Sequence, residues 1–339
     1  MAQNKFRSAL AVVKESFSEW KEDNASRLAA SLAYYTAFSM APLLVLVISI
    51  AGLLGGQKAA QDAVIGQVQG FMGEQGKEFI QSMLVSASQP RSGLVASVIG
   101  IVALLFGALG VFGELQSSLN TIWEVKPKPV KGMAQGIWRF LKQRILSFSM
   151  VLAIGFVLIA SLAVSAALTS IQTMIWSGSS FPAWITQVIN QVVSFLVILV
   201  LFALMFKFLP DAEIAWRDVW LGAAVTSLLF NLGKFAIGFY LGRSSVDSTF
   251  GAAGSLALVL IWVYYSAQIF FFGAEVTQVF ANEYGSRIVP DENAVKVTEQ
   301  ERAQQGIPHK ETMEEGGSQD TGNEKMKKEE VLDHSHKMR

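Results

Sequence analysis

Three ionisable side chains lie inside or at the ends of long apolar stretches, where they could bind or move a polar group. They are Glu114, Lys234 and Glu275. A charge in an apolar segment is costly unless it faces another helix or water. Each of the three therefore marks either a path for a substrate or proton, or an anchor at a helix end. The sequence leaves both readings open.

Polar side chains, charged and uncharged, recur at helical spacing in the same stretches, which places them on shared helix faces. The pairs on one face are Arg27 with Tyr35, Asn231 with Lys234, and Gln268 with Glu275. Such faces either line a polar cavity or form interhelical hydrogen bonds worth roughly 0.6–2 kcal/mol each.

Depth along the helices limits which charges can meet. Lys234 follows Arg217 by 17 residues, which is about 25 Å of helix. Lys234 should therefore snorkel toward the opposite end or meet Asp247, and should not pair with Glu275 or Glu114. The sequence predicts a separate inner charged cluster that contains Glu114, Glu275, Arg27, Lys207 and Arg217.

The composition indicates that these residues lie in a membrane protein. Of 339 residues, 52% are hydrophobic and 16% are charged, against about 25% charged in ordinary soluble domains. Residues 145–206 contain no acidic, basic or histidine side chain. The chain has no cysteine, and its three histidines lie after residue 308. We therefore expect no metal site and no cofactor, and the absence of a strong basic patch argues against nucleic acid as a partner.

The predicted fold is an all-α membrane protein with six transmembrane helices. About 20 apolar residues are needed to cross the hydrocarbon core. Pro42 interrupts the first such stretch and is a hinge candidate, as are Gly251 and Gly254 before the last. The predicted spans are 29–54, 92–115, 145–170, 184–209, 217–241 and 253–280.

Lysine and arginine predict the orientation of these spans. Thirteen lysine and arginine residues lie in the N-terminal segment, in the link between the second and third spans, and in the link between the fourth and fifth. Four lie in the links on the other side of the membrane. Because the excess marks the cytoplasmic side, both termini should be cytoplasmic, which requires an even number of spans.

The parts outside the spans divide the chain into three regions. Residues 1–28 should form a cytoplasmic amphipathic segment, after which Asp23 or Asn24 caps the first span. Residues 29–284 should form the transmembrane domain, with amphipathic helices at 59–88 in the first outer loop, interrupted near Gly76. Residues 285–339 are rich in charged residues and poor in apolar ones, and they should form a disordered cytoplasmic tail.

Several short motifs make the chain resemble a known family of bacterial inner-membrane proteins, the YihY/BrkB family of virulence factors. The resemblance covers roughly residues 20–284 in order. The motifs are AASLAYY at 29–35, SMAPLL at 39–44, GELQ at 113–116, LNTIW at 119–123, LP at 209–210, WRD at 216–218, GAAGS at 251–255, WVY at 262–264 and GAE at 273–275.

The resemblance implies a multi-pass protein of the bacterial inner membrane with a role in envelope integrity. Some members are associated with serum resistance or lipopolysaccharide export, which favours transport of a lipid or amphiphile. An older label for such sequences is ribonuclease BN. The clustered ligands and basic surface that a metal-dependent nuclease needs are not evident in this sequence.

The leading hypothesis is therefore a transporter or lipid-translocating permease, and not an enzyme. Membrane lipids would be its partners, an anionic lipid or amphiphile its substrate, and self-association remains open. The alternative is a non-transporting scaffold or envelope-assembly factor that works through its amphipathic helices and tail. The substrate-path candidates are Arg27, Tyr35, Glu114, Arg217, Asn231, Lys234, Gln268 and Glu275.

Overall fold

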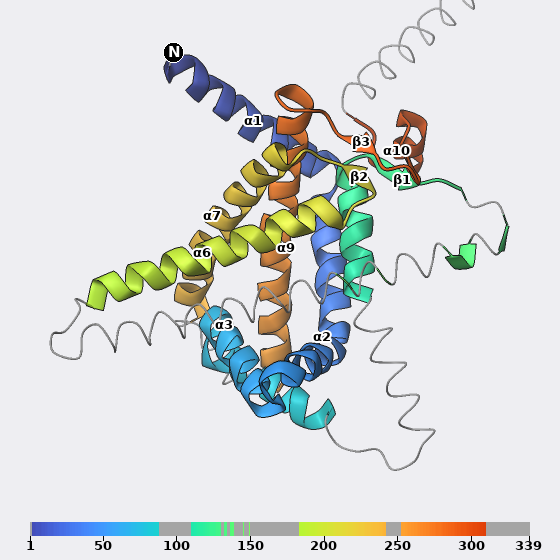
Figure 1. Cartoon of the computed structure of the whole chain (residues 1–339). Helices are drawn as coiled ribbons and strands as arrows, with labels where there is room; N and C mark the ends of the chain where they lie inside the picture. Colours follow the sequence, from blue (N-terminus) through green and yellow to red (C-terminus); the bar gives the residue numbers. More distant parts are fainter. Residues whose placement is uncertain are drawn as a thin grey trace, which may run out of the picture.

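The computed structural model of the chain describes residues 2–87, 110–129, 183–241 and 252–309, with isolated positions between 132 and 149. Figure 1 shows long helices that converge at one end on a group of short strands. The helices are α1 (Ala2–Glu22), α2 (Ala25–Gly55), α3 (Gln57–Ala87), α6 (Ala183–Phe208), α7 (Trp216–Leu241), α9 (Ala252–Glu283) and α10 (Glu299–Gln305). Residues 110–122 are also helical.

Among the described residues, four helices are long and apolar enough to cross a membrane. Their apolar stretches are Ala25–Leu53, Gln191–Phe208, Trp216–Ala236 and Leu256–Glu283. They correspond to the predicted spans 29–54, 184–209, 217–241 and 253–280, so these four predictions are confirmed as helices. The predicted span 145–170 and most of 92–115 lie outside the described residues. The helix predicted to end at 115 continues to residue 122.

The helices meet in one apolar core. Its buried members come from α2, from residues 111–123, and from α6, α7 and α9. Representative members are Ala29, Leu119, Phe206, Ala223 and Phe271, and all five are completely or almost completely buried. Most of the length of α2, α6, α7 and α9 is apolar, which is the pattern of helices with lipid on one side and protein on the other.

Helices α7 and α9 cross at a reciprocal pair of glycines. A Cβ atom at Gly222 would lie 1.7 Å from Oγ1 of Thr277, and a Cβ atom at Gly273 would lie 1.7 Å from Oγ1 of Thr226. Each threonine donates its hydroxyl to the glycine carbonyl of its own helix, at 2.7 Å and 2.8 Å. Small residues at a crossing let two backbones approach closely, as in other membrane helix pairs.

The N-terminal helix α1 lies against α9 through a narrow face. Val12 packs with Val276 and Val279, and Ser16 is fully buried. The stripe predicted to be amphipathic points the other way, because Leu10, Val13 and Phe17 are about half exposed. The helix prediction is therefore confirmed, while its contact with a membrane surface stays a prediction.

The segment predicted as amphipathic helices at 59–88 is α3. Its helical geometry breaks at Gly73, which has φ 74° and ψ −167°, three residues before Gly76, near which the interruption was predicted. A positive φ is accessible to glycine at little cost, which allows the chain to turn there. Ile65 and Ile80 pack with Ile48 of α2, so α3 covers the far end of that helix.

Two short antiparallel strand pairs were not predicted, and they correct the purely helical description. Strand β1 (Val125–Pro127) pairs with β4 (Ala294–Lys296), and β2 (Ala212–Glu213) pairs with β3 (Val289–Pro290). Residues 286–309, which we call the C-terminal arm, are therefore held by two interhelical links. The predicted disorder is wrong for the arm, because its backbone finds strand partners on the bundle. Residues 310–339 lie outside the described residues.

Candidate functional site

The two strand pairs and α10 lie at one end of the bundle, where α2 and α7 begin and α9 ends. A group of polar side chains lies at the same end. We call this the charged end (Figure 1). Its central contact joins residues 279 positions apart: Nη2 of Arg302 lies 2.7 Å from Oδ1 of Asp23. Both side chains are almost fully buried, at 2% and 1% exposure. A buried ion pair of this kind is stable only when further polar contacts surround it.

Helix α10 positions Arg302. Thr298 begins the helix with a capping box in which its side chain and that of Glu301 each bond the other's backbone, and Gly306 ends it with φ 77°. Lys126 of β1 forms an ion pair with Glu301 that fastens the exposed side of α10. The local sequence thus forms a short helix, and the strand pairs direct its arginine into the bundle.

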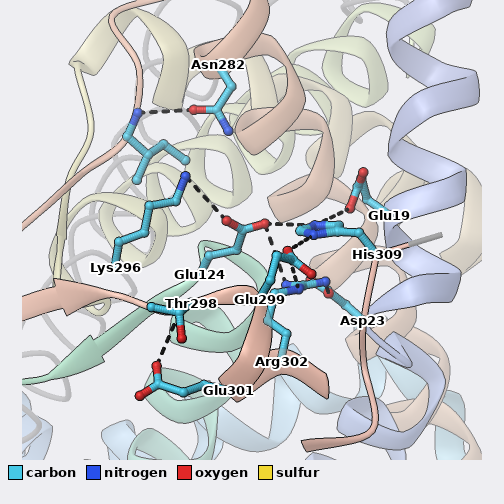
Figure 2. A network of polar contacts seen from close by, with 11 residues as sticks. Glu19, Asp23, Glu124, Asn282, Lys296, Thr298, Glu299, Glu301, Arg302 and His309 are labelled. Atoms are coloured by element: carbon cyan, nitrogen blue, oxygen red, sulfur yellow. Dashed lines mark hydrogen bonds and ion pairs between the residues drawn. The ribbon is translucent and has the colours of Figure 1, made fainter. Parts of the chain in front are cut away.

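Glu124 lies just after the helix of residues 110–122, and its carboxylate is close to several basic side chains. Its φ of 53° is unusual for a residue other than glycine. Its carboxylate oxygens lie 3.6 Å from Nη1 of Arg302, 3.0 Å from Nε2 of His309 and 3.5 Å from Nζ of Lys296. Figure 2 shows Glu124 between these three cations. The turn at Glu124 therefore links the arm to the helical core.

Burial shifts the protonation of the groups around this pair. It raises the pKa of Asp23 to about 7, although the charge and hydrogen bond of Arg302 act in the opposite direction. Burial also raises the pKa of Glu19, which lies 3.9 Å from Nε2 of His309. For His309, burial lowers the pKa, but the hydrogen bond with Glu299 and the negative charges of Glu124 and Glu299 together outweigh it, so the pKa is raised. The charged end can therefore take up protons near neutral pH.

Asp211, in the link between α6 and α7, organises a second polar cluster. Its carboxylate accepts hydrogen bonds from the amide nitrogens of Gln116 at 3.1 Å and Asn120 at 2.8 Å. The side-chain oxygen of Asn120 accepts from the backbone N–H of Asp211 at 2.9 Å. The backbone N–H of Asp291 completes the cluster by bonding the Asp211 carbonyl at 3.0 Å.

A cavity of about 500 Å³ lies between the two clusters. Its polar lining includes Gln116, Asn120, Glu124, Lys126, Asp211 and Arg302. The volume falls within the range of about 300–1,000 Å³ typical of small-molecule sites. The lining carries both signs of charge together with amide donors and acceptors, so the cavity suits a polar or charged group. In the part of the chain that the structure describes, no three His, Cys, Asp or Glu side chains could hold a metal ion.

Glu275 lies deeper than the cavity, in the last turns of α9. It is fully buried, and neither carboxylate oxygen has a hydrogen-bond partner among the described residues. The charges that act on it come first from Asp23, then from Glu19, Arg302 and Glu124. The preceding residue is held in place because Trp123 Nε1 donates to the Ala274 carbonyl at 3.3 Å.

The predicted inner cluster is therefore wrong in its membership. Glu275 does join buried charges, but they are not the predicted partners: Arg27 and Arg217 are exposed. Lys207 donates to the Ile214 carbonyl at 2.6 Å instead. Glu114 is half-buried. Local spacing placed these residues at the correct end of the helices, but it did not determine which face each one occupies.

The other candidates are distributed over several helices. Asn231 is buried, accepts from Gln191 at 3.1 Å and donates to the Ser227 carbonyl at 2.8 Å, so it joins α6 to α7. Lys234 lies 6.0 Å from the ring centre of Phe235. Gln268 is half-buried, and its side-chain oxygen is buried without a partner among the described residues.

The remaining candidates are placed as follows. Tyr35 is 42% exposed and stacks edge-on with Tyr34. Pro42 lies within α2, which continues past it to Gly55, and Gly254 is buried near the start of α9. Gly251, and with it Asp247 as a partner for Lys234, lies outside the described residues. No contact brings these candidates and Glu275 together into one path among the described residues.

Sequence reasoning missed the residues that form the site. Asp23 or Asn24 was expected to cap α2. Asn24 occupies the cap position, without a side-chain hydrogen bond, and the carboxylate of Asp23 bonds Arg302 instead. The capping-box pattern of Thr298 and Glu301, followed by Gly306, was a signal for α10 that the tail's composition concealed. No local signal could have paired Asp23 with Arg302.

Comparison with known proteins agrees with the membrane helices. The pattern of the family described as Virulence factor BrkB matches residues 16–298. This chain belongs to the BrkB family. The match begins in α1 and ends at the N-cap of α10, so it includes Asp23, Glu124, Asp211 and Glu275. No solved structure is significantly similar to the chain.

Relatives in this family are described as UPF0761 membrane proteins. The protein of Ralstonia nicotianae is 27% identical over 261 residues, which are 75% of this chain and 55% of the relative. That of Teredinibacter turnerae is 27% identical over 278 residues, 81% of this chain and 61% of the relative. That of Aeromonas salmonicida is 26% identical over 267 residues, 77% of this chain and 86% of the relative. This BrkB-family chain is therefore an integral membrane protein, and it spans little more than half the length of the first two relatives.

Proposed function

We propose that this BrkB-family protein is a permease of the bacterial inner membrane that moves an anionic lipid or other amphiphile. Its termini lie in the cytoplasm, and the head group enters through the cavity at the charged end. The apolar tail of the substrate remains beside the helices, in the lipid.

The cavity is the observation that carries this proposal. It is polar, has the volume of a ligand site, and lies where apolar helices long enough to cross a membrane converge. At the same end, α2 and α7 begin with exposed Arg27 and Arg217, which are suited to attract an anionic head group. An isolated polar group in hydrocarbon costs several kcal/mol, so a transporter must supply such a polar site.

The test is reconstitution of the full chain into liposomes that contain a trace of fluorescent phosphatidylglycerol or phosphatidylcholine. A reductant added outside bleaches the probe on the outer leaflet, so transport appears as a second, slower loss of fluorescence. We expect faster transfer of phosphatidylglycerol than of phosphatidylcholine. Ser117→Trp, which places a large side chain in the cavity lining, should abolish the transfer.

Ser82→Trp is the matched control, because Ser82 is exposed on α3 and outside the cavity lining. It should transport like the unmodified chain. Folded protein that moves neither lipid, or a Ser117→Trp variant as fast as Ser82→Trp, would refute the permease.

One observation favours a second candidate, a non-transporting scaffold for envelope assembly. Leu10, Val13 and Phe17 present an exposed apolar stripe on α1 that the rest of the described chain does not cover. A scaffold would use this stripe to hold a membrane surface or a partner. Replacement of Leu10, Val13 and Phe17 by serine should then impair envelope integrity in cells, while lipid transfer in liposomes is unchanged.

Enzymatic activity and binding of nucleic acid are not part of the proposed function. Among the described residues that line the cavity, no hydroxyl forms a hydrogen bond with a basic side chain, and Lys126 and Arg302 already pair with carboxylates. Purified protein that cleaves RNA, with Glu124→Gln inactive in the same preparation, would reverse this view.

A further inference from the structure

The charged end has more buried acid than its cations can neutralise. The groups that face one another come from every element packed there. Six of these groups are carboxylates: Glu19, Glu22 and Asp23 of the first helix and its turn, Glu124, Glu275 of α9, and Glu299 of α10. Three are basic: Lys296 of β4, Arg302 of α10, and His309.

Arg302 cannot serve all of these acids. Its Nη2 pairs with Asp23, its Nη1 faces Glu124 at 3.6 Å, and its Nε lies 4.0 Å from Glu299. Lys296 and His309 approach Glu124 from the outer side. Within the described residues, no cation forms an ion pair with Glu275.

The two innermost carboxylates have oxygens without partners. Both oxygens of Glu275 and Oδ2 of Asp23 are buried and accept no hydrogen bond among the described residues. An ionised carboxylate in that state is strongly destabilised, whereas a carboxylic acid is neutral and loses only its hydrogen bonds. Binding of a proton is the smallest change that removes the excess charge.

We infer that Glu275 and Asp23 form a proton-binding site, in which each carboxylate takes up one proton to become a neutral acid. Arg302 lines the cavity and contacts Asp23 directly, so one side chain separates Asp23 from the cavity. Protons therefore reach Asp23 from the charged end, and Glu275 is the deeper group. When Asp23 is neutral, Arg302 remains balanced by Glu124 and Glu299.

The site goes beyond the proposed transport, because it binds protons whether or not a lipid moves. The two ideas can therefore fail separately: lipid transfer is read in liposomes, and the proton site is read by spectroscopy on purified protein in detergent.

The experiment is infrared difference spectroscopy of the full chain from about pH 5 to about pH 9, with carboxylic acids identified by their C=O band and its shift in deuterated water. We expect one component that is lost near pH 7, where Asp23 titrates, and a second that persists above it. Asp23→Asn should remove the first component, and Glu275→Gln should remove the second.

Glu283→Gln is the control, because Glu283 is exposed at the end of the same helix. It should leave both components unchanged. If Glu275→Gln does not fold, unmodified protein labelled with ¹³C at the glutamate side-chain carboxyl answers the same question, since the persistent component must shift. A persistent component that is unaffected by the variant or the label overturns the inference.

Discussion

At the scale of residues, Asp23 and Arg302 connect the first transmembrane helix to a segment near the end of the chain. Asp23 lies in the turn between α1 and α2, and Arg302 projects from a helix only 7 residues long. Neither side chain reaches water to any useful extent. When one partner of such a pair is removed, the other is left as an unpaired buried charge. The free energy of unfolding therefore falls by more than the intact pair contributes to it.

We expect Arg302→Ala to destabilise the protein by about 3–5 kcal/mol, the usual cost of leaving one member of a buried pair alone. The thermal midpoint in detergent, followed by the loss of monodisperse protein, measures this. Arg217→Ala is the matched control, because Arg217 is exposed at the start of α7 and should change stability by less than about 0.5 kcal/mol. Equal effects of the two substitutions would mean that the pair does not hold the arm.

The stability of the charged end should fall as the pH rises. Asp23 has a pKa of about 7 in the folded chain and an ordinary value of 3.8. Between these values the folded protein keeps a proton that the unfolded chain has released, so the stabilisation is largest at low pH and is lost as the pH rises through about 7. Burial raises the pKa of Glu19, and the pKa of His309 is also raised, so both act with the same sign.

The measurement is the thermal midpoint at about pH 5 and about pH 8, which should be lower at the higher pH. Asp23→Asn should reduce this difference because its amide does not titrate. Asp62→Asn, exposed on α3, should leave it unchanged. A midpoint that increases between these two pH values would contradict the assignment.

At the scale of elements, α7 and α9 can approach closely only because Gly222 and Gly273 lack a Cβ atom. Gly222→Ala should destabilise the protein by about 1–3 kcal/mol, since its new methyl group would overlap Thr277. Thermal unfolding of the single variant and of the Gly222→Ala, Thr277→Ala double variant tests this, and the second change should restore part of the loss.

Gly66→Ala in α3 is the control for this crossing. A Cβ atom at Gly66 meets nothing within 4 Å, so alanine should be neutral or stabilise the helix by up to about 1 kcal/mol. Equal losses at Gly66 and Gly222 would show that helix propensity, and not the crossing, is responsible.

The C-terminal arm is the second element whose role can be tested. A chain that ends at residue 309 should keep the thermal midpoint of the full protein, because the arm and its contacts remain. A chain that ends at residue 285 loses both strand pairs and Arg302, and its midpoint should fall by at least about 6 °C. If both truncations behave like the full chain, the arm does not stabilise the bundle.

At the scale of the whole molecule, orientation in the membrane is the main expectation that follows from charge alone. The excess of lysine and arginine predicts that the charged end, and both termini, lie in the cytoplasm. Reporters that are active only in the periplasm should be inactive after residue 309 and active when inserted at Gly56, between α2 and α3. Termini on opposite sides of the membrane would contradict the even number of spans.

The sequence best predicted the parts of the structure that depend on interactions between residues close together in the chain. The ends of α6 and α7 lie within one residue of their predicted positions, because an apolar run long enough to cross a bilayer is a local property. The predicted break in α3 missed Gly73 by three residues, since several glycines compete in that segment. The arm was predicted to be disordered because the segment from residue 285 onward is rich in charged residues and poor in apolar ones, but the arm packs on the core of the bundle.

The sequence by itself indicated that lipid surrounds this protein, and it determined the positions of the apolar helices and the family. These properties depend on composition and on spacing within about 30 residues. Only the tertiary structure decided that Arg302 meets Asp23, that Gly222 meets Thr277, and that Glu275 is buried without a hydrogen-bond partner among the described residues. The physical reason is that burial and charge pairing depend on which surfaces come together, and residues 279 positions apart carry no local signal of their contact.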